Sequence, residues 1–175
     1  MQVKTPKDLI ILIRCVCESF DGHADENEVA LLLGTAAVES GFKSRVQWLS
    51  GPARGLWQME PVTARDVFEN YLIRRADLWL RLVQWFPDYS LSIMPTKKEL
   101  SGYLRDDDRF ACVMARIHYL RKTAPIPTTL TGQAEYWKAN YNTKAGRGTV
   151  EKYLAAWEAC GCDALMACML SAING

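Results

Sequence analysis

Glu39 is the residue whose position most clearly suggests chemistry. It follows a run, Val29–Val38, that contains no charged side chain, so a helix through this run would be buried on nearly all sides. A carboxyl group at the end of such a helix lies beside apolar neighbours and near the negative end of the helix dipole, and both effects raise its pKa. A neutral Glu39 could protonate the oxygen of a breaking glycosidic bond, whereas an ordinary helix-terminal glutamate is exposed to solvent.

Amide and hydroxyl side chains occur in two later segments that could bind a sugar. Gln58 follows a Gly-Leu-Trp sequence, and Tyr141-Asn142 precedes the glycines Gly146 and Gly148. An amide offers a donor and an acceptor together, which suits hydroxyl and acetamido groups, and glycines allow a close approach of the backbone. The structural alternative is that Gln58 is a loop amide and that Tyr141-Asn142 ends a helix before a turn.

Three segments in this order resemble the motifs of the soluble lytic transglycosylase and goose-type lysozyme superfamily. The first is Glu39-Ser40. The second, 51–61, reads Gly-Pro-Ala-Arg-Gly-Leu-Trp-Gln-Met-Glu-Pro and is followed by Thr63-Ala64. The third is Asn140-Tyr141-Asn142 before the two glycines, with Asn140 in place of the family's alanine and with extra residues before the glycines. The resemblance spans residues 39–148.

The resemblance implies a fold and a role for each matching residue. The fold would be all-α or mainly α, a lysozyme-like helical domain with at most one short β-hairpin near the catalytic cleft. Glu39 would be the catalytic acid, and Ser40 would support the substrate or orient the glutamate. Gln58 would hydrogen-bond the sugar, while Tyr141 and Asn142 would orient Glu39 and the N-acetyl group of the substrate.

Aromatic residues flank the same motifs, namely Trp48, Trp57, Tyr136 and Trp137. An aromatic face can stack on a sugar ring, but aromatic residues at helical spacing more often belong to a core. Of these residues we assign Trp57, which precedes Gln58, to substrate binding.

The reaction that the resemblance implies is cleavage of the β-1,4 bond between N-acetylmuramic acid and N-acetylglucosamine in peptidoglycan. Ordinary glycosidases need two carboxylates, but the motifs supply only Glu39, which favours a lytic transglycosylase that forms 1,6-anhydromuramic ends. One alternative is a hydrolytic goose-type-like muramidase, in which Glu60 or Asp66 would position water. Another is a non-catalytic structural or binding module of a phage tail that retains the lysozyme fold. No cofactor and no metal are expected.

Helical periodicity predicts the elements that would carry these residues. Thr96 with Glu99 forms a capping box, and Gly41 is typical of a helix C terminus. No segment shows the sustained alternation of a sheet, so the predicted fold class is all-α. The predicted helices are 7–20, 27–40, 62–71, 76–85, 97–104, 109–121, 133–141, 150–160 and 164–173.

The composition is that of one globular domain, 1–175, with the core motifs within 26–160. Hydrophobic residues make up 49% and charged residues 23% of the chain, and the net charge is +1, which excludes a disordered chain and leaves no basic footprint for nucleic acid. The six cysteines lack metal-ligand spacing and are expected to be reduced core thiols. Asp106–Asp108 is interpreted as a helix cap rather than a metal site, and His118 as a packed or rim residue.

The start of the chain lacks the pattern of a signal peptide because Arg14 and Glu18 interrupt its early apolar run, and no segment predicts a membrane span. Together with the resemblance, this favours a bacteriophage protein that acts on the bacterial cell wall in the periplasm. It would be an endolysin, held in the host cytoplasm until release, or a virion-associated lysin. The expected partners are peptidoglycan glycan strands, without nucleic acid or membrane insertion. In the virion, phage tail or baseplate proteins could dock on the uncharged helix 164–173, unless that helix closes the core.

Overall fold

The chain folds as an all-α protein, as the sequence predicts. The computed structural model describes residues 1–47, 49, 51–89, 91, 94–142 and 146–174, with side chains described up to residue 171. The described part contains nine α-helices, one short 3₁₀ helix and one π turn. They are α1 (Pro6–Asp21), α2 (Glu26–Ser40), α3 (Pro61–Asn70), η2 (Leu72–Arg74), α4 (Ala76–Trp85), α5 (Lys97–Asp106), α6 (Asp108–Leu120), α7 (Leu130–Trp137), η3 (Lys138–Asn142), α8 (Val150–Ala159) and α9 (Cys162–Asn174).

Local capping explains where several helices begin and end. The predicted capping box of α5 is present, with the Thr96 hydroxyl accepting from the Glu99 backbone N–H and the Glu99 carboxylate accepting from that of Thr96. Thr5 and Asp8 form a second box at the start of α1. Gly41 ends α2 in the left-handed conformation, with φ 57°, as the sequence predicts.

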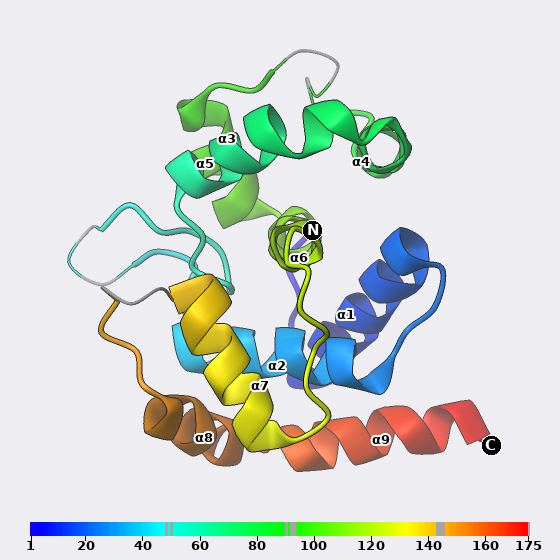
Figure 1. Cartoon of the computed structure of the whole chain (residues 1–175), viewed down its shortest axis with the longest axis vertical. Coiled ribbons are helices and arrows are strands. Elements are labelled where there is room, and N and C mark those ends of the chain that lie inside the picture. The colour runs from blue at the N-terminus through cyan, green and yellow to red at the C-terminus, as the bar shows by residue number, and fades with distance from the viewer. Residues whose placement is uncertain (48, 50, 90, 92–93, 143–145, 175) are drawn as a thin grey trace.

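The helices form two groups on either side of α6 (Figure 1). On one side lie α3, α4 and α5, and on the other lie α1, α2, α7, α8 and α9, with α6 in contact with helices of both groups. Helix α2, whose run from Val29 to Val38 is uncharged, packs against α1, α7 and α8, and its residues from Leu31 to Ala37 are all buried. The end of α2, which carries Glu39, is therefore fixed by a rigid core element.

Buried ion pairs join α6 to the group that contains α2. The Arg116 guanidinium of α6 lies 2.7 Å from Asp21 at the end of α1 and 2.6 Å from Glu28 in α2. At the start of α6, Asp108 is fully buried and lies 2.6 Å from Arg45, in the segment that follows α2. These pairs tie the segments before and after α2 to the central helix.

The segment between α2 and α3 contains two isolated β-bridges, Val46 with Arg54 and Arg54 with Met59. No β-strand occurs in the described residues, which agrees with the expectation of at most one short hairpin. The bridges fold the segment back on itself. They hold the backbone around Gln58 beside the end of α2, where the Gln58 side chain donates to the carbonyl oxygen of Ser44, 3.1 Å away.

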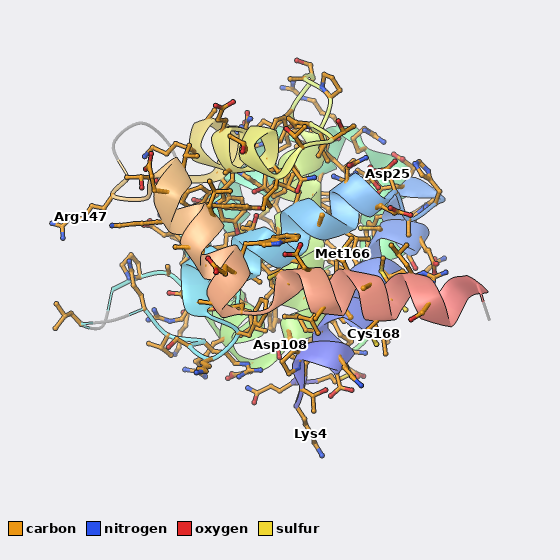
Figure 2. All side chains as sticks on the ribbon, turned by 90° about the horizontal axis from the view of Figure 1, so that it is seen from below. Lys4, Asp25, Asp108, Arg147, Met166 and Cys168 are labelled. Atoms are coloured by element: carbon orange, nitrogen blue, oxygen red, sulfur yellow. The ribbon has the colours of Figure 1, made fainter. Side chains whose placement is uncertain are left out.

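Helix α9 closes one side of the core. It packs against α1, α2 and α8 and lies across the face seen in Figure 2, with Cys162, Leu165 and Met169 buried and Cys168 exposed. In the described residues no single helix is long and apolar enough to cross a membrane. Helices α8 and α9 reach the length and apolar composition of a membrane span only when they are taken together, and a 60° bend separates them.

All six cysteines are unpaired. The expectation of core thiols holds for the three that are buried, Cys17, Cys112 and Cys162. It is wrong for Cys15 and Cys168, which are exposed because they lie on the outward faces of α1 and α9.

Candidate active site

A cleft of about 680 Å³ brings together residues that are far apart in the sequence. Its walls are the end of α2, the bridged segment up to the start of α3, His118 of α6, the π turn η3, and the glycine segment 146–148. Figure 1 shows the segment after α2 and the segment before α8 on the same side of the molecule. Of the residues predicted to act on a substrate, Glu39, Ser40, Gln58, Tyr141 and Asn142 all line this cleft.

Glu39 lies in the penultimate position of α2, where the helix reaches the cleft. Burial raises the pKa of Glu39 to about 7, because desolvation disfavours the charged carboxylate. The run from Val29 to Val38 contributes no charge, and no ion pair offsets the burial in the described part of the chain. Near neutral pH, a large fraction of Glu39 is therefore the neutral acid.

Trp137, the last residue of α7, is the hydrogen-bond partner of this acid. Its indole Nε1 donates to Oε1 of Glu39 over 3.1 Å, and the indole is 1% exposed. The bond favours the carboxylate and so lowers the pKa of Glu39, but burial has the larger effect. From the sequence, Trp137 is expected only to stack on a sugar or to belong to the core. Its position four residues before Tyr141, which places both residues on one face of the predicted helix 133–141, is the signal that could identify it.

Tyr141 does not orient Glu39 through a direct hydrogen bond, which corrects the role that the resemblance implied. Its hydroxyl donates to the backbone carbonyl of Trp57 over 2.9 Å. Burial raises the pKa of Tyr141 well above its usual range, so the phenol stays neutral. Tyr141 thus joins the cleft wall at η3 to the bridged segment that carries Gln58.

Gln58 lies in the cleft in an unusual backbone conformation, with φ 45°. Its Nε2 donates to the carbonyl oxygens of Ser44, at 3.1 Å, and Gly55, at 2.7 Å. The side-chain oxygen has no protein partner among the described residues, so it can accept a hydrogen bond from a ligand. Ser40 also lines the cleft, where its hydroxyl donates back to the Ala36 carbonyl over 2.9 Å.

Asn142 holds the glycine segment against η3. Its Oδ1 accepts from the Gly148 backbone N–H at 3.2 Å and from Lys138 Nζ at 2.9 Å. The Lys138 ammonium also donates to the Gly146 carbonyl over 2.8 Å. The structure differs from the predicted single helix over 133–141. Helix α7 ends at Trp137, and the chain continues as the π turn that directs Tyr141 and Asn142 into the cleft wall.

The expectation that Trp57 binds a sugar is wrong. Its side chain is 0% exposed, and its indole donates to the Leu32 carbonyl over 2.9 Å, so the ring packs inside the core rather than in the cleft. Tyr136 is also buried, with its hydroxyl donating to the Ala124 carbonyl. Trp48, the other aromatic residue considered for stacking, lies outside the described residues.

Glu60 is the second carboxylate of the cleft and is exposed. Asp66, the other candidate for positioning water, is directed elsewhere, with an ion pair to Arg121 at 2.7 Å and a hydrogen bond from Asn70. His118 lines the cleft as a rim residue, and its Nε2 donates to the Asn140 carbonyl over 3.1 Å. Burial lowers the pKa of His118 to about 4, so it is neutral at pH 7.

Metal-ligand side chains cluster elsewhere. In the described residues one group, Cys17, Asp21 and Glu28, places potential ligand atoms within 4.8 Å of one another. Arg116 already neutralises both carboxylates of that group, which is not part of the cleft. Asp107 caps α6 by accepting from the Arg109 backbone N–H, so the interpretation of the acidic triplet as a helix cap is confirmed.

Comparison of the chain with protein-family models, with curated proteins and with solved structures finds no match in any of the three.

Proposed function

We propose that this protein cleaves the glycan strands of peptidoglycan at the β-1,4 bond between N-acetylmuramic acid and N-acetylglucosamine. The observation that carries the proposal is a cleft in which burial raises the pKa of Glu39 to about 7. Amide groups of Gln58 and Asn142, suited to amino sugars, line the same cleft. The resemblance of the segments around these residues to lytic transglycosylases and goose-type lysozymes supports the same substrate.

The neutral carboxyl group of Glu39 begins the reaction as a general acid. It gives its proton to the glycosidic oxygen while the bond from that oxygen to the anomeric carbon of muramic acid breaks. The leaving group is the 4-hydroxyl of N-acetylglucosamine, and Glu39 becomes a carboxylate. In transglycosylation, the carboxylate then accepts the proton of the muramic acid 6-hydroxyl as this oxygen attacks the anomeric carbon. The product is a 1,6-anhydro sugar, Glu39 regains its proton, and no water is consumed.

Transglycosylation is the form of the reaction that we favour, because it needs one carboxyl group. Glu39 is the carboxyl group of the cleft that is buried against the core. Hydrolysis is the second candidate, and it is supported by the exposed Glu60 in the same cleft, which could position a water molecule. The position of Asp66, paired with Arg121, argues against a role for that residue in hydrolysis.

Arg147 supports peptidoglycan as the substrate rather than an uncharged glycan. It lies in the glycine segment of the cleft wall and projects outward from the body of the protein (Figure 2). Its guanidinium group has no side-chain partner among the described residues, and the stem peptides of peptidoglycan carry carboxylates. The guanidinium of Arg147 could donate two parallel hydrogen bonds to a stem-peptide carboxylate beside the cleft.

The test is incubation of the wild-type protein and Glu39→Gln with purified sacculi, followed by mass spectrometry of the released fragments. Anhydro-muropeptides from the wild type alone are the expected result. Fragments with reducing ends would support hydrolysis, and Glu60→Gln would then be expected to abolish them. Absence of any fragment would favour a non-catalytic module. Action in the periplasm as a phage endolysin or a virion-associated lysin is the setting that we propose.

A further inference from the structure

We propose that Trp137 is a positioning residue that directs the catalytic proton of Glu39 to Oε2, the carboxyl oxygen open to the cleft. The catalytic role of Trp137 rests on the proposed function, but the hydrogen bond and the position of the proton can be tested without any substrate. It assigns a role to a residue outside the three segments that suggested the activity.

The two oxygens of the Glu39 carboxyl group differ in their surroundings. Oε1 accepts the indole N–H of Trp137 at 3.1 Å. Oε2 has no hydrogen-bond partner among the described residues, and it is not one of the fully buried polar atoms that lack one, so it is open to the cleft. An indole nitrogen can donate but cannot accept. Oε1 must therefore present a lone pair to it. The carbonyl oxygen of a neutral carboxylic acid is a better acceptor than the hydroxyl oxygen, so this hydrogen bond favours the tautomer with the proton on Oε2.

Two neighbours restrict the indole of Trp137. Tyr153 of α8 packs against it in a tilted arrangement, with 5.5 Å between ring centroids. Gly148 lies against the edge of the ring, where a Cβ atom would come within 2.3 Å of Cη2 of the indole. The side-chain oxygen Oδ1 of Asn142 accepts from the Gly148 backbone N–H and so fixes this approach. A ring enclosed in this way keeps its N–H directed at one oxygen of Glu39.

Among the described residues, no other group duplicates this hydrogen bond. The phenols of Tyr119 in α6 and Tyr141 in η3 are near enough to Glu39 for a Coulomb interaction. Burial raises the pKa of both phenols well above the usual range, so they are neutral. His118 is neutral because burial lowers its pKa to about 4. In the described lining of the cleft, the remaining charged groups are Glu60 and Arg147, and both are exposed and screened by solvent.

The bond also serves the second half of the proposed reaction. After Oε2 has released its proton, the carboxylate charge is shared by both oxygens, and the bond from Trp137 becomes charge-assisted and stronger. Trp137 thus stabilises the carboxylate that must next act as a base. Without it, Glu39 would hold its proton more tightly and its carboxyl group could rotate.

Nuclear magnetic resonance of the Glu39 side-chain carboxyl carbon, titrated in the wild type, Trp137→Phe and Trp157→Phe, tests the inference. The Glu39 signal is identified by its loss in Glu39→Gln. We expect Trp137→Phe to raise the pKa of Glu39 by about 0.5 to 1, because the carboxylate loses its donor. Trp157→Phe is the matched control, since Trp157 also donates from a buried indole to a carboxylate, Asp163, but lies outside the cleft. It should leave the pKa of Glu39 unchanged.

A second measurement does not depend on the folding of Trp137→Phe. In the wild-type protein, the indole N–H resonance of Trp137 should shift with pH at the same midpoint as Glu39, and Glu39→Gln should abolish that shift. The indole of Trp57, which donates to a backbone carbonyl, should show no such midpoint. A Trp137 resonance that is independent of pH, or a Glu39 pKa that Trp137→Phe leaves unchanged, would overturn the inference. If these titrations behave as expected but sacculi are not cleaved, the proposed function fails and the placement of the proton stands.

Discussion

Gly148 lies so close to Trp137 that a Cβ atom on residue 148 would be 2.3 Å from Cη2 of the indole. The same Cβ atom would be 2.8 Å from the side-chain amide of Asn142. Real Cβ contacts are not this short, so the glycine of the third motif is required by the packing of the indole that holds Glu39. Because no positive φ is recorded for Gly148, the requirement is one of space rather than of backbone conformation.

Gly148→Ala should therefore displace the indole of Trp137 and weaken its hydrogen bond to Glu39. Since misplacement of a catalytic group by about 1 Å can cost up to about 100-fold in rate, we expect activity on sacculi to fall by about 10- to 100-fold. The pKa of Glu39 should rise, as in Trp137→Phe. Gly102→Ala is the control, because nothing lies within 4 Å of its Cβ position and the residue is in the interior of α5. It should stabilise the fold by about 0.5 to 1 kcal/mol and leave activity unchanged.

Stability should depend on pH through Glu39. Its folded-state pKa of about 7 lies above the ordinary value of 4.5, so the folded protein binds the proton more tightly than the unfolded chain does. The associated stability is fully present below about pH 4.5 and is lost as the pH rises to about 7. Glu39→Gln keeps the shape and an acceptor for Trp137 but has no charge to desolvate. We expect it to be more stable than the wild type at pH 8, by about 1 to 3 kcal/mol.

Urea unfolding at pH 4 and pH 8 measures this effect. The advantage of Glu39→Gln at pH 8 should shrink or disappear at pH 4, where Glu39 is mostly neutral in both states of the wild type. Equal stability of the two proteins at pH 8 would show that Glu39 is not buried against the core as described.

Tyr141→Phe separates the observed role of this residue from the role that the motif resemblance implied. The substitution removes the hydrogen bond from Tyr141 to the Trp57 carbonyl, which should cost about 1 kcal/mol of stability. Activity should fall because the cleft wall at η3 loosens, but the pH at which activity is lost should stay where it is in the wild type. A pH profile shifted as in Trp137→Phe would instead indicate that Tyr141 contacts Glu39 when substrate is bound.

The helices could be predicted because their signals are local. The uncharged run before Glu39, the capping box of Thr96 and Glu99, and the stop at Gly41 each lie within a few residues of the boundary that they determine. The set of cleft residues was also largely predictable, since Glu39, Gln58 and Asn142 each belong to a short segment with a recognisable pattern.

The contacts between these segments could not be predicted. Arg116 reaches Asp21 and Glu28 across 95 and 88 residues of sequence, and nothing local marks either pair. Likewise, Trp57 lies next to Gln58 but points the other way, into the core, because a single residue step in a tight turn reverses the side-chain direction. The partner of Glu39 had to be seen in three dimensions, because Trp137 is 98 residues away.

Arg147→Ala tests whether the cleft recognises the charged stems of peptidoglycan. Loss of an exposed ion pair should raise the KM for peptide-bearing glycan by about two- to fivefold, with little change in kcat. The KM for glycan strands stripped of peptide should not change, and added salt should reduce the difference between the two proteins. Lys4→Ala removes the same charge from a part of the chain that does not line the cleft (Figure 2) and should have no effect. A KM that rises equally for both substrates would exclude stem recognition by Arg147.

The most direct test of the central claim is the mass of the fragments that the protein releases from purified sacculi, compared between the wild type and Glu39→Gln. A proton donated by Glu39 to the glycosidic oxygen, with internal attack by the 6-hydroxyl, predicts anhydro-muropeptides from the wild type and none from the variant. Each anhydro product is lighter by one water molecule than the hydrolytic product. Equal release of glycan fragments by both proteins, or release by neither, would contradict the assignment of Glu39 as the catalytic acid.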